Sequence, residues 1–315
     1  MATAREVKQR IKSVKNISHI TRAMQAVSAS KVQRATQALE ATRPYATKAW
    51  EVLTHLATQP GRANMHPLLA TRDQVSQVMV VLITADRGLA GPYNTNIIRH
   101  TLRRFGNYAV PVQFVTLGRK GRDILYRRGL NIVADFSPVP DPPTFTDISP
   151  VGRLVVDAFL TEQVDEVYVV YTDFINMLRQ EPRIKKLLPL SLESEERVMD
   201  YALPGATATY IYEPGEQELL DEIVPRFTQL QIFQAMLESR ASEHAARMVA
   251  MKNATDNATE LAHALQLEYN KARQQSITSE MLDIAGGAEA LAQALAKAKA
   301  QAVKAEEATK AQAAA

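Results

Sequence analysis

Two glycine-containing segments that follow predicted strands have the composition of a phosphate-binding loop. The first is DRGLAGPYN, residues 86–94, and the second is Gly118-Arg119-Lys120-Gly121. Backbone amides at the start of a helix can hold a phosphate group. Neither segment matches GxGxxG, or GxxxxGK followed by Ser or Thr. We therefore expect both segments to be tight turns that reverse the chain, with phosphate binding as the less favoured alternative.

Metal-ligating and nucleophilic side chains are too scattered to form a site. The six histidines show no ligand spacing, and the chain contains no Cys. The absence of Cys excludes thiol catalysis, thiolate metal sites and disulfide bonds. No combination of acid, base and nucleophile stands out. We expect no catalytic residue, no metal and no cofactor in this chain.

The composition is that of a folded globular protein. Of the 315 residues, 46% are hydrophobic and 23% are charged, which is typical of globular proteins, and the length favours two structural units. The net charge of +3 is too small to favour nucleic acid as a partner. The sequence has neither the long apolar run of a membrane helix nor a secretory signal. We expect a soluble, cytoplasmic protein.

Two long segments that lack Gly and Pro predict helices near the two ends of the chain, at Met1–Arg43 and Arg226–Ala285. In the first, a helical apolar band is predicted from Val7, Ile11, Val14, Ile17, Ile20, Met24 and Val27. The second has the seven-residue repeat of a supercoil, at Leu237, Ala241, His244, Met248, Met251, Thr255, Ala258, Ala262 and Leu265. At ~1.5 Å per residue the second helix measures roughly 90 Å. We expect it to pair with the first helix as an antiparallel coiled coil.

Between the long helices, strand-like and helical segments alternate. Strands are predicted at 78–84, 110–117, 130–135, 166–172 and 208–212, and helices at 95–104, 120–128 and 148–160. This alternation predicts a largely parallel sheet. The predicted fold class is therefore α/β plus coiled coil, with a Rossmann-like α/β domain inserted between the two long helices.

The predicted elements divide the chain into four parts. They are an N-terminal helix at 1–58, the α/β domain at 75–212, a second long helix at 213–287 and a helical tail at 288–315. A Pro-rich link, SPVPDPPTF, lies at 137–145 inside the α/β domain. The tail is rich in Ala and Lys, so we expect an exposed helix with little apolar bulk to bury.

Several motifs, in the same order along the chain, resemble the gamma subunit of F-type ATP synthases. Near the C-terminus they are ARMVAMKNATDNA (246–258), YNKARQ (269–274) and ITSEMLDIAGGAEA (277–290). RIKSVKNISHITRAMQAVSASK (10–31) is similar to the first helix of that family, and ITADRGLAGPYNTN (83–96) to the first strand and loop of its central domain. The resemblance covers most of the chain.

The resemblance implies a rotor subunit without catalytic residues of its own, present in one copy per complex. In that family the two terminal helices form a shaft inside a ring of three alpha and three beta subunits, and the α/β domain rests on the epsilon subunit and the c-ring. The shaft transmits torque between the ion-driven c-ring and the catalytic head during ATP synthesis or hydrolysis. The implied location is peripheral, on the cytoplasmic face of the cell membrane.

By motif position, the resemblance also implies residues that contact the ring. These are Arg247, Gln274, Thr278 and Asp283 near the C-terminus, and Arg22, Met24 and Lys31 near the N-terminus. Each of them, taken without the motif, fits a solvated helix face better than a ring contact.

The chain departs from the family pattern at three points. Ala90 and Pro92 stand where Cys and Gly are common, there is no cysteine-bearing regulatory insertion, and the chain continues beyond Gly287. A role of the tail in supporting the shaft or restricting reverse rotation is a hypothesis.

Two functions of other classes stay open on sequence grounds. One is a static coiled-coil adaptor. The other is an enzyme whose α/β domain binds a nucleotide and whose coiled coil forms a dimer, although the missing phosphate fingerprint counts against it.

Overall fold

The computed structural model describes residues 4–57, 66–72, 74–190 and 216–313. The predicted strand at 208–212 lies outside these residues. The helices are α1 (Ala4–Ala57), the short 3-10 helix η1 (Pro67–Leu69), α2 (Tyr93–Phe105), α3 (Arg119–Arg127), α4 (Phe145–Leu160) and α5 (Glu216–Ala313). The strands are β1 (Val78–Ile83), β2 (Val112–Leu117), β3 (Ile132–Asp135), β4 (Glu166–Phe174) and β5 (Gln180–Leu188).

The five strands form one sheet in the order β3-β2-β1-β4-β5. The first four strands are parallel, and β5 pairs with β4 in the antiparallel direction. The largely parallel α/β sheet is therefore confirmed, but β5 was not predicted. Its sequence, QEPRIKKLL, is charged and contains a Pro, as is common in strands at the edge of a sheet.

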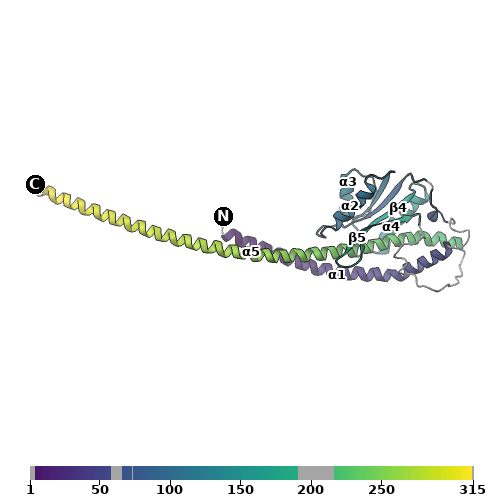
Figure 1. Cartoon of the computed structure of the whole chain (residues 1–315), viewed down its shortest axis with the longest axis horizontal. Coiled ribbons are helices and arrows are strands. Elements are labelled where there is room, and N and C mark those ends of the chain that lie inside the picture. The colour runs from purple at the N-terminus through teal and green to yellow at the C-terminus, as the bar shows by residue number, and fades with distance from the viewer. Residues whose placement is uncertain (1–3, 58–65, 73, 191–215, 314–315) are drawn as a thin grey trace. The chain divides into compact units, whose positions relative to one another are not determined.

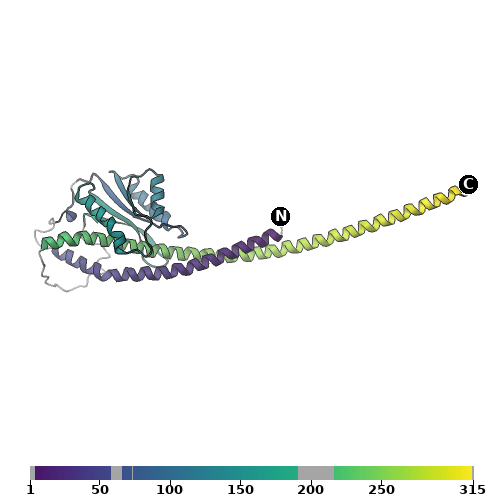
Figure 2. The same ribbon diagram turned by 180° about the vertical axis from the view of Figure 1, so that it is seen from behind.

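The two faces of the sheet are covered by different helices (Figure 1; Figure 2). Strand β1 illustrates this, because successive side chains of a strand point to opposite faces. Val78, Val80 and Leu82 pack with residues of α2 and α3. Met79, Val81 and Ile83 join a core that includes residues of α4, of α5 and of the C-terminal end of α1. We call the sheet with α2, α3 and α4 the sheet domain.

The chain divides into two compact units, which are described separately. The larger unit spans Thr21–Asn253, and the smaller unit combines residues 1–20 with residues 254–315. In the larger unit, α1 and α5 are antiparallel: the Trp50 and Phe227 rings are 5.7 Å apart, whereas Lys31 and His244 share one carboxylate partner. In the smaller unit, the Ser18 and Thr259 hydroxyl oxygens are 3.3 Å apart. The predicted pairing of the two long helices is confirmed.

The seam predicted on α5 is correct, but the apolar band predicted on α1 is wrong at Ile17, Ile20 and Val27, whereas Met24 is half-buried. Ile17, Ile20 and Val27 are 51%, 60% and 57% exposed, whereas Thr21 and Ser28 are buried. Ile11, Val14, Ile17 and Ile20 are spaced by three residues, so they drift around the helix. A supercoiled seam requires steps of three and four in alternation. Register, rather than hydrophobicity, therefore decides which α1 residues are buried.

Helix α5 continues without interruption through Gly286 and Gly287 to Ala313. Each Gly costs about 1 kcal/mol in a helix, but the flanking segments are rich in Ala, Leu, Glu and Lys, which are strong helix formers. The separate tail at 288–315, like the rest of the predicted domain division, stays a prediction. In the part of the chain that the structure describes, we find no helix with the length and apolar character of a membrane span.

Packing of α4 on α5 gives a stability prediction. A Cβ atom added at Gly152 of α4 would lie 2.4 Å from Gln229 Cγ and 3.0 Å from Gln229 Cα of α5. Gly152→Ala should therefore lower the free energy of unfolding by about 1–3 kcal/mol. At Gly286 a Cβ atom would meet nothing within 4 Å, so Gly286→Ala should be neutral or stabilising by up to about 1 kcal/mol. Urea denaturation followed by circular dichroism compares them, and equal stability of the two variants would contradict this packing.

Candidate functional site: the crevice at the carboxyl edge of the sheet

The carboxyl ends of the four parallel strands meet at one edge of the sheet. In the order β3-β2-β1-β4-β5, the chain runs from β1 to β2 and β3 on one side and then crosses to β4 on the other side of β1. The topological switch point therefore lies between β1 and β4. In open α/β sheets, ligands bind in the crevice at this point. What fills this crevice therefore bears directly on the function of the chain.

Helix α5 fills this crevice with its own side chains. Thr172 of β4 donates its backbone N–H to Ser239 Oγ at 3.1 Å, and Ser242 Oγ donates to the Thr172 carbonyl at 3.1 Å. Thr172 lies opposite Pro182 of β5, which has no N–H to donate. Tyr93 Oη at the start of α2 donates to the Ser239 carbonyl at 3.1 Å. Two serines of α5 thus take the place of a neighbouring strand.

The second glycine segment serves packing at the same edge. A Cβ atom at Gly118 would lie 2.1 Å from the Thr84 carbonyl oxygen, and the residue has a φ of +106°. At the start of α3, the Gly121 amide donates to Thr84 Oγ1 at 2.9 Å, and the Lys120 amide donates to the Ala85 carbonyl at 3.1 Å. These amides, which a phosphate would need, donate to the end of β1 instead.

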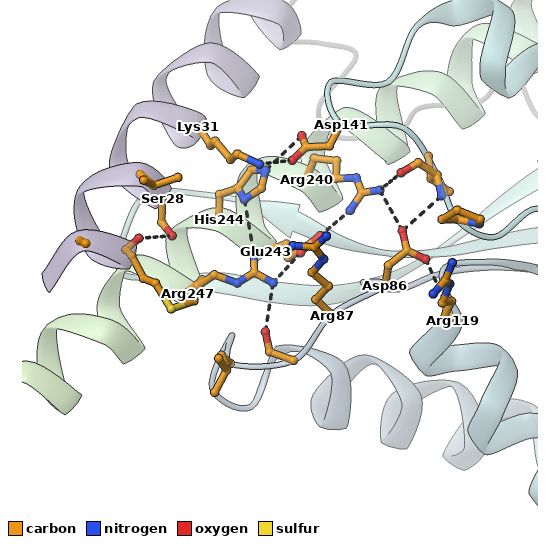
Figure 3. Close-up of a pocket in the computed structure, with 17 residues that line it drawn as sticks. Ser28, Lys31, Asp86, Arg87, Arg119, Asp141, Arg240, Glu243, His244 and Arg247 are labelled. Carbon is orange, nitrogen blue, oxygen red and sulfur yellow. Dashed lines mark hydrogen bonds and ion pairs between the residues drawn. The ribbon is translucent and has the colours of Figure 1, made fainter. Parts of the chain in front are cut away.

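Beside the filled crevice lies an open cleft of about 860 Å³, shown in Figure 3. Its walls come from α1, the loop after β1, the start of α3, the Pro-rich loop before α4 and the middle of α5. The charged residues that line it are Lys31, Asp86, Arg87, Arg119, Asp141, Arg240, Glu243, His244 and Arg247.

Arg240 lies at the centre of the ion pairs in this cleft. Its side chain is 6% exposed, and it contacts Glu243 Oε2 at 2.8 Å and Asp86 Oδ2 at 3.5 Å. It also donates to the Val139 carbonyl at 2.9 Å. Asp86 in turn accepts hydrogen bonds from the backbone amides of Arg119 and Val139. One arginine of α5 therefore contacts two loops of the sheet domain, and Asp86 extends the network to the start of α3.

A second ion-pair group joins α1 to α5 through Asp141. Asp141 Oδ2 is 2.6 Å from Lys31 Nζ of α1, and Asp141 Oδ1 is 3.4 Å from His244 Nε2 of α5. The hydrogen bond to His244 lowers the pKa of Asp141 most, and Lys31 lowers it further against the opposing effect of burial. The carboxylate therefore remains charged well below the usual pH at which Asp is protonated.

Three of the predicted ring-contact residues line this cleft: Met24, Lys31 and Arg247. Arg247 is 12% exposed and contacts Glu243 Oε1 at 2.7 Å, and it donates to the Gly88 carbonyl at 3.2 Å. The other four residues do not line the cleft and are exposed: Arg22, Gln274, Thr278 and Asp283. The described contacts of Lys31 and Arg247 are thus made within the chain itself.

Sequence reasoning missed the residues that organise this edge of the sheet. The missed residues are Arg240, Glu243 and Asp86. Arg240 and Glu243 precede the predicted Arg247 at helical spacing of three and four residues, and Asp86 follows a predicted strand. That spacing was a usable signal for one charged helix face. The serine partners of Thr172 gave no signal, because a Ser in a long helix is an ordinary residue.

The arrangement joins elements rather than converting a substrate. The charged groups of the cleft are largely paired with one another, and the crevice is filled by side chains. Among the described residues, no three His, Asp or Glu side chains are grouped so that they could hold a metal ion. The geometry is that of a joint between a sheet domain and two helices.

The central role of Arg240 gives a second stability prediction. Arg240→Met leaves Asp86 without its buried cationic partner and leaves Glu243 with Arg247 alone, so it should lower the free energy of unfolding by about 3–5 kcal/mol. Arg226→Met is the matched control: its pair with Glu222 is 64% and 62% exposed, and its loss should cost less than about 1 kcal/mol. Chemical denaturation measures both, and a small loss for Arg240→Met would refute this account of the ion pairs.

Comparisons with known proteins give the family. The family model described as ATP synthase matches residues 3–291. Two curated relatives called ATP synthase gamma chain come from Roseiflexus sp. (strain RS-1) and Dehalococcoides mccartyi (strain CBDB1). They are 44% identical over 298 and 294 residues, each covering 93% of this chain and 100% of the relative. A gamma chain from Legionella pneumophila (strain Corby) is 41% identical over 294 residues, covering 92% of this chain and 100% of the relative.

Solved structures share the fold at lower identity. A chain of the Euglena gracilis mitochondrial ATP synthase, in a structure of OSCP/F1/c-ring, superposes with a TM-score of 0.60 at 22% identity, covering 91% of this chain and 94% of that chain. A chain of the rotor of the same enzyme gives a TM-score of 0.57 at 17% identity, covering 87% and 98%. Together with the near-complete match to curated gamma chains, these findings establish that the chain belongs to the gamma-subunit family of F-type ATP synthases, the central-stalk subunit of those enzymes.

Proposed function

We propose that this chain is the rotating shaft of its ATP synthase and carries no catalytic residue. The sheet domain receives torque from the c-ring and the epsilon subunit, and the paired helices α1 and α5 carry it into a ring of three alpha and three beta subunits. One copy serves each complex, at the cytoplasmic face of the membrane. The observation that supports this most is the crevice, because α5 occupies it through Ser239 and Ser242 where a ligand would bind.

The filled crevice also bears on the nucleotide-binding alternative. The backbone amides of Gly121 and Lys120 donate within the chain, so a phosphate at this place would have to break existing hydrogen bonds. Calorimetry of the chain with ATP, ADP and NAD tests this alternative, and we expect no heat of binding.

The static-adaptor alternative differs from the rotor in one respect, which is whether α5 must turn relative to its surroundings. Because the chain has no Cys, a thiol introduced by Ser279→Cys, at an exposed position, is unique in this subunit. Oxidative crosslinking of this thiol to a cysteine placed on a facing ring subunit should stop ATP hydrolysis, and a reductant should restore it. If the chain were a static adaptor, the crosslinked complex would still hydrolyse ATP.

We propose two kinds of role for the candidate ring-contact residues. Gln274, Thr278 and Asp283 have exposed side chains on α5, which supports direct contact with the ring. Arg22 belongs with them, at an exposed position of α1. Met24, Lys31 and Arg247 line the cleft, so their roles include holding the loops that face the ring.

The direct role is tested most cleanly at Gln274. Gln274→Ala removes one polar contact worth about 0.5–1.5 kcal/mol, so ATP synthesis should slow roughly two- to tenfold while the folded chain and its assembly are unchanged. Gln266→Ala, an exposed Gln two turns earlier on α5, is the control and should retain the wild-type rate. Wild-type synthesis in both variants would remove Gln274 from the ring contact.

A further inference from the structure

The Pro-rich loop before α4 has no role in the function described so far. Its sequence from Pro138 to Pro142 is PVPDP, and we call this segment the prolyl strut. Each Pro fixes its own φ near −65°, and each residue before a Pro is restricted as well. Asp141 lies between Pro140 and Pro142 and therefore sits in one of the stiffest stretches of the chain.

The strut is fixed to the carboxyl edge of the sheet at Val139. Its amide donates to Asp86 Oδ2 at 3.2 Å, and its carbonyl accepts from Arg240 Nη2 at 2.9 Å. The Val139 side chain is buried in the core shared by the sheet and α5. Both backbone groups and the side chain thus hold one end of the strut.

From this fixed point the strut presents a carboxylate to both long helices. Asp141 directs one oxygen to Lys31 of α1 and the other to His244 of α5, as Figure 3 shows. His244 is 4% exposed at this contact, so the α5 side is buried, whereas Lys31 is 42% exposed. A single side chain of the sheet domain therefore bridges two helices that are far apart in the sequence.

The geometry points to Asp141 as a positioning residue for torque transfer, through which the sheet domain holds α1 and α5 so that both helices turn with it. This inference rests on the proposed function. The hydrophobic core already joins the sheet domain to α5 and to the C-terminal end of α1, through residues such as Leu53. Lys31 lies six turns nearer the N-terminus, where Asp141 gives the domain a second hold on α1.

Docking of the strut can be measured by thiol labelling in the assembled ATP synthase. The chain has no Cys, so Val139→Cys introduces one thiol at a site that is 7% exposed. In this background Asp141→Ala should speed maleimide labelling of this subunit by up to about fivefold, the most that an exposed ion pair usually contributes. Asp157→Ala, which removes an exposed Asp of α4, should leave the rate unchanged.

The functional arm measures the ions pumped per ATP hydrolysed in membrane vesicles, without the Val139 substitution. Asp141→Ala should lower this ratio in proportion to the rise in the population of the undocked strut, and Asp141→Glu should restore part of it. Asp157→Ala should keep the wild-type ratio. A residue with a merely structural role would lower the amount of assembled enzyme and leave the ratio unchanged.

The two arms separate failure of this inference from failure of the proposed function. Unchanged labelling or an unchanged pumping ratio in Asp141→Ala would overturn the inference while leaving the rotor intact. If the Ser279→Cys enzyme with Asp141 unchanged still hydrolyses ATP when crosslinked to the ring, the proposed function itself fails, whatever Asp141 does.

Discussion

The fold depends on two hydrogen bonds at the carboxyl edge of the sheet, in which side chains of α5 take the place of a neighbouring strand. The Thr172 N–H donates to Ser239 Oγ of α5, and the Thr172 carbonyl accepts from Ser242 Oγ, opposite Pro182, which has no N–H to donate. Buried backbone groups without partners are costly, so this strand end and this turn of α5 stabilise each other. The crevice in which other α/β domains bind a ligand therefore binds helix α5 of the same chain.

Charged groups around the contact between β4 and α5 join further parts of the sheet domain to the two long helices. Arg240 connects α5 to the loop after β1 and to the prolyl strut, and Asp141 connects the strut to α1. The buried ion pairs of Arg240 add little net stability over an apolar core, but they penalise any arrangement that separates the partners. That property suits a joint whose task is to keep its geometry under load. The cleft and the crevice are in this sense parts of one attachment.

Much of this organisation was predictable from local patterns, because each pattern has a direct physical cause. The strands around Val80 and Val115 follow from buried β-branched runs, and the α5 seam from Met251 to Leu265 follows from a repeat of seven residues. The apolar band predicted on α1 was wrong because it followed hydrophobicity alone. Ile17 and Ile20 are apolar but fall outside the supercoil register. Hydrophobicity alone cannot distinguish a seam from an exposed face that another molecule covers.

The joint itself was less predictable, because it consists of pairings between distant segments. Nothing near Ser239 indicates a partner at Thr172, and Asp141 was visible only as part of a Pro-rich link. The glycines at 118 and 121 were predicted to form a tight turn, with phosphate binding less favoured, but nothing in the sequence indicated their close approach to Thr84. The motifs that carried the family resemblance lie in α1, in α5 and around the loop after β1, but a motif indicates the family and does not give the contacts that its residues make.

The central claim is that the sheet domain and the two long helices turn as one body. It is tested most directly by single-molecule observation of the assembled enzyme, with the alpha and beta subunits fixed and a probe attached to the exposed edge of the sheet domain at Val133, which is 49% exposed. The account predicts that ATP drives continuous rotation of the probe in one direction. A probe that stays in place or fluctuates without direction while ATP is hydrolysed would contradict it.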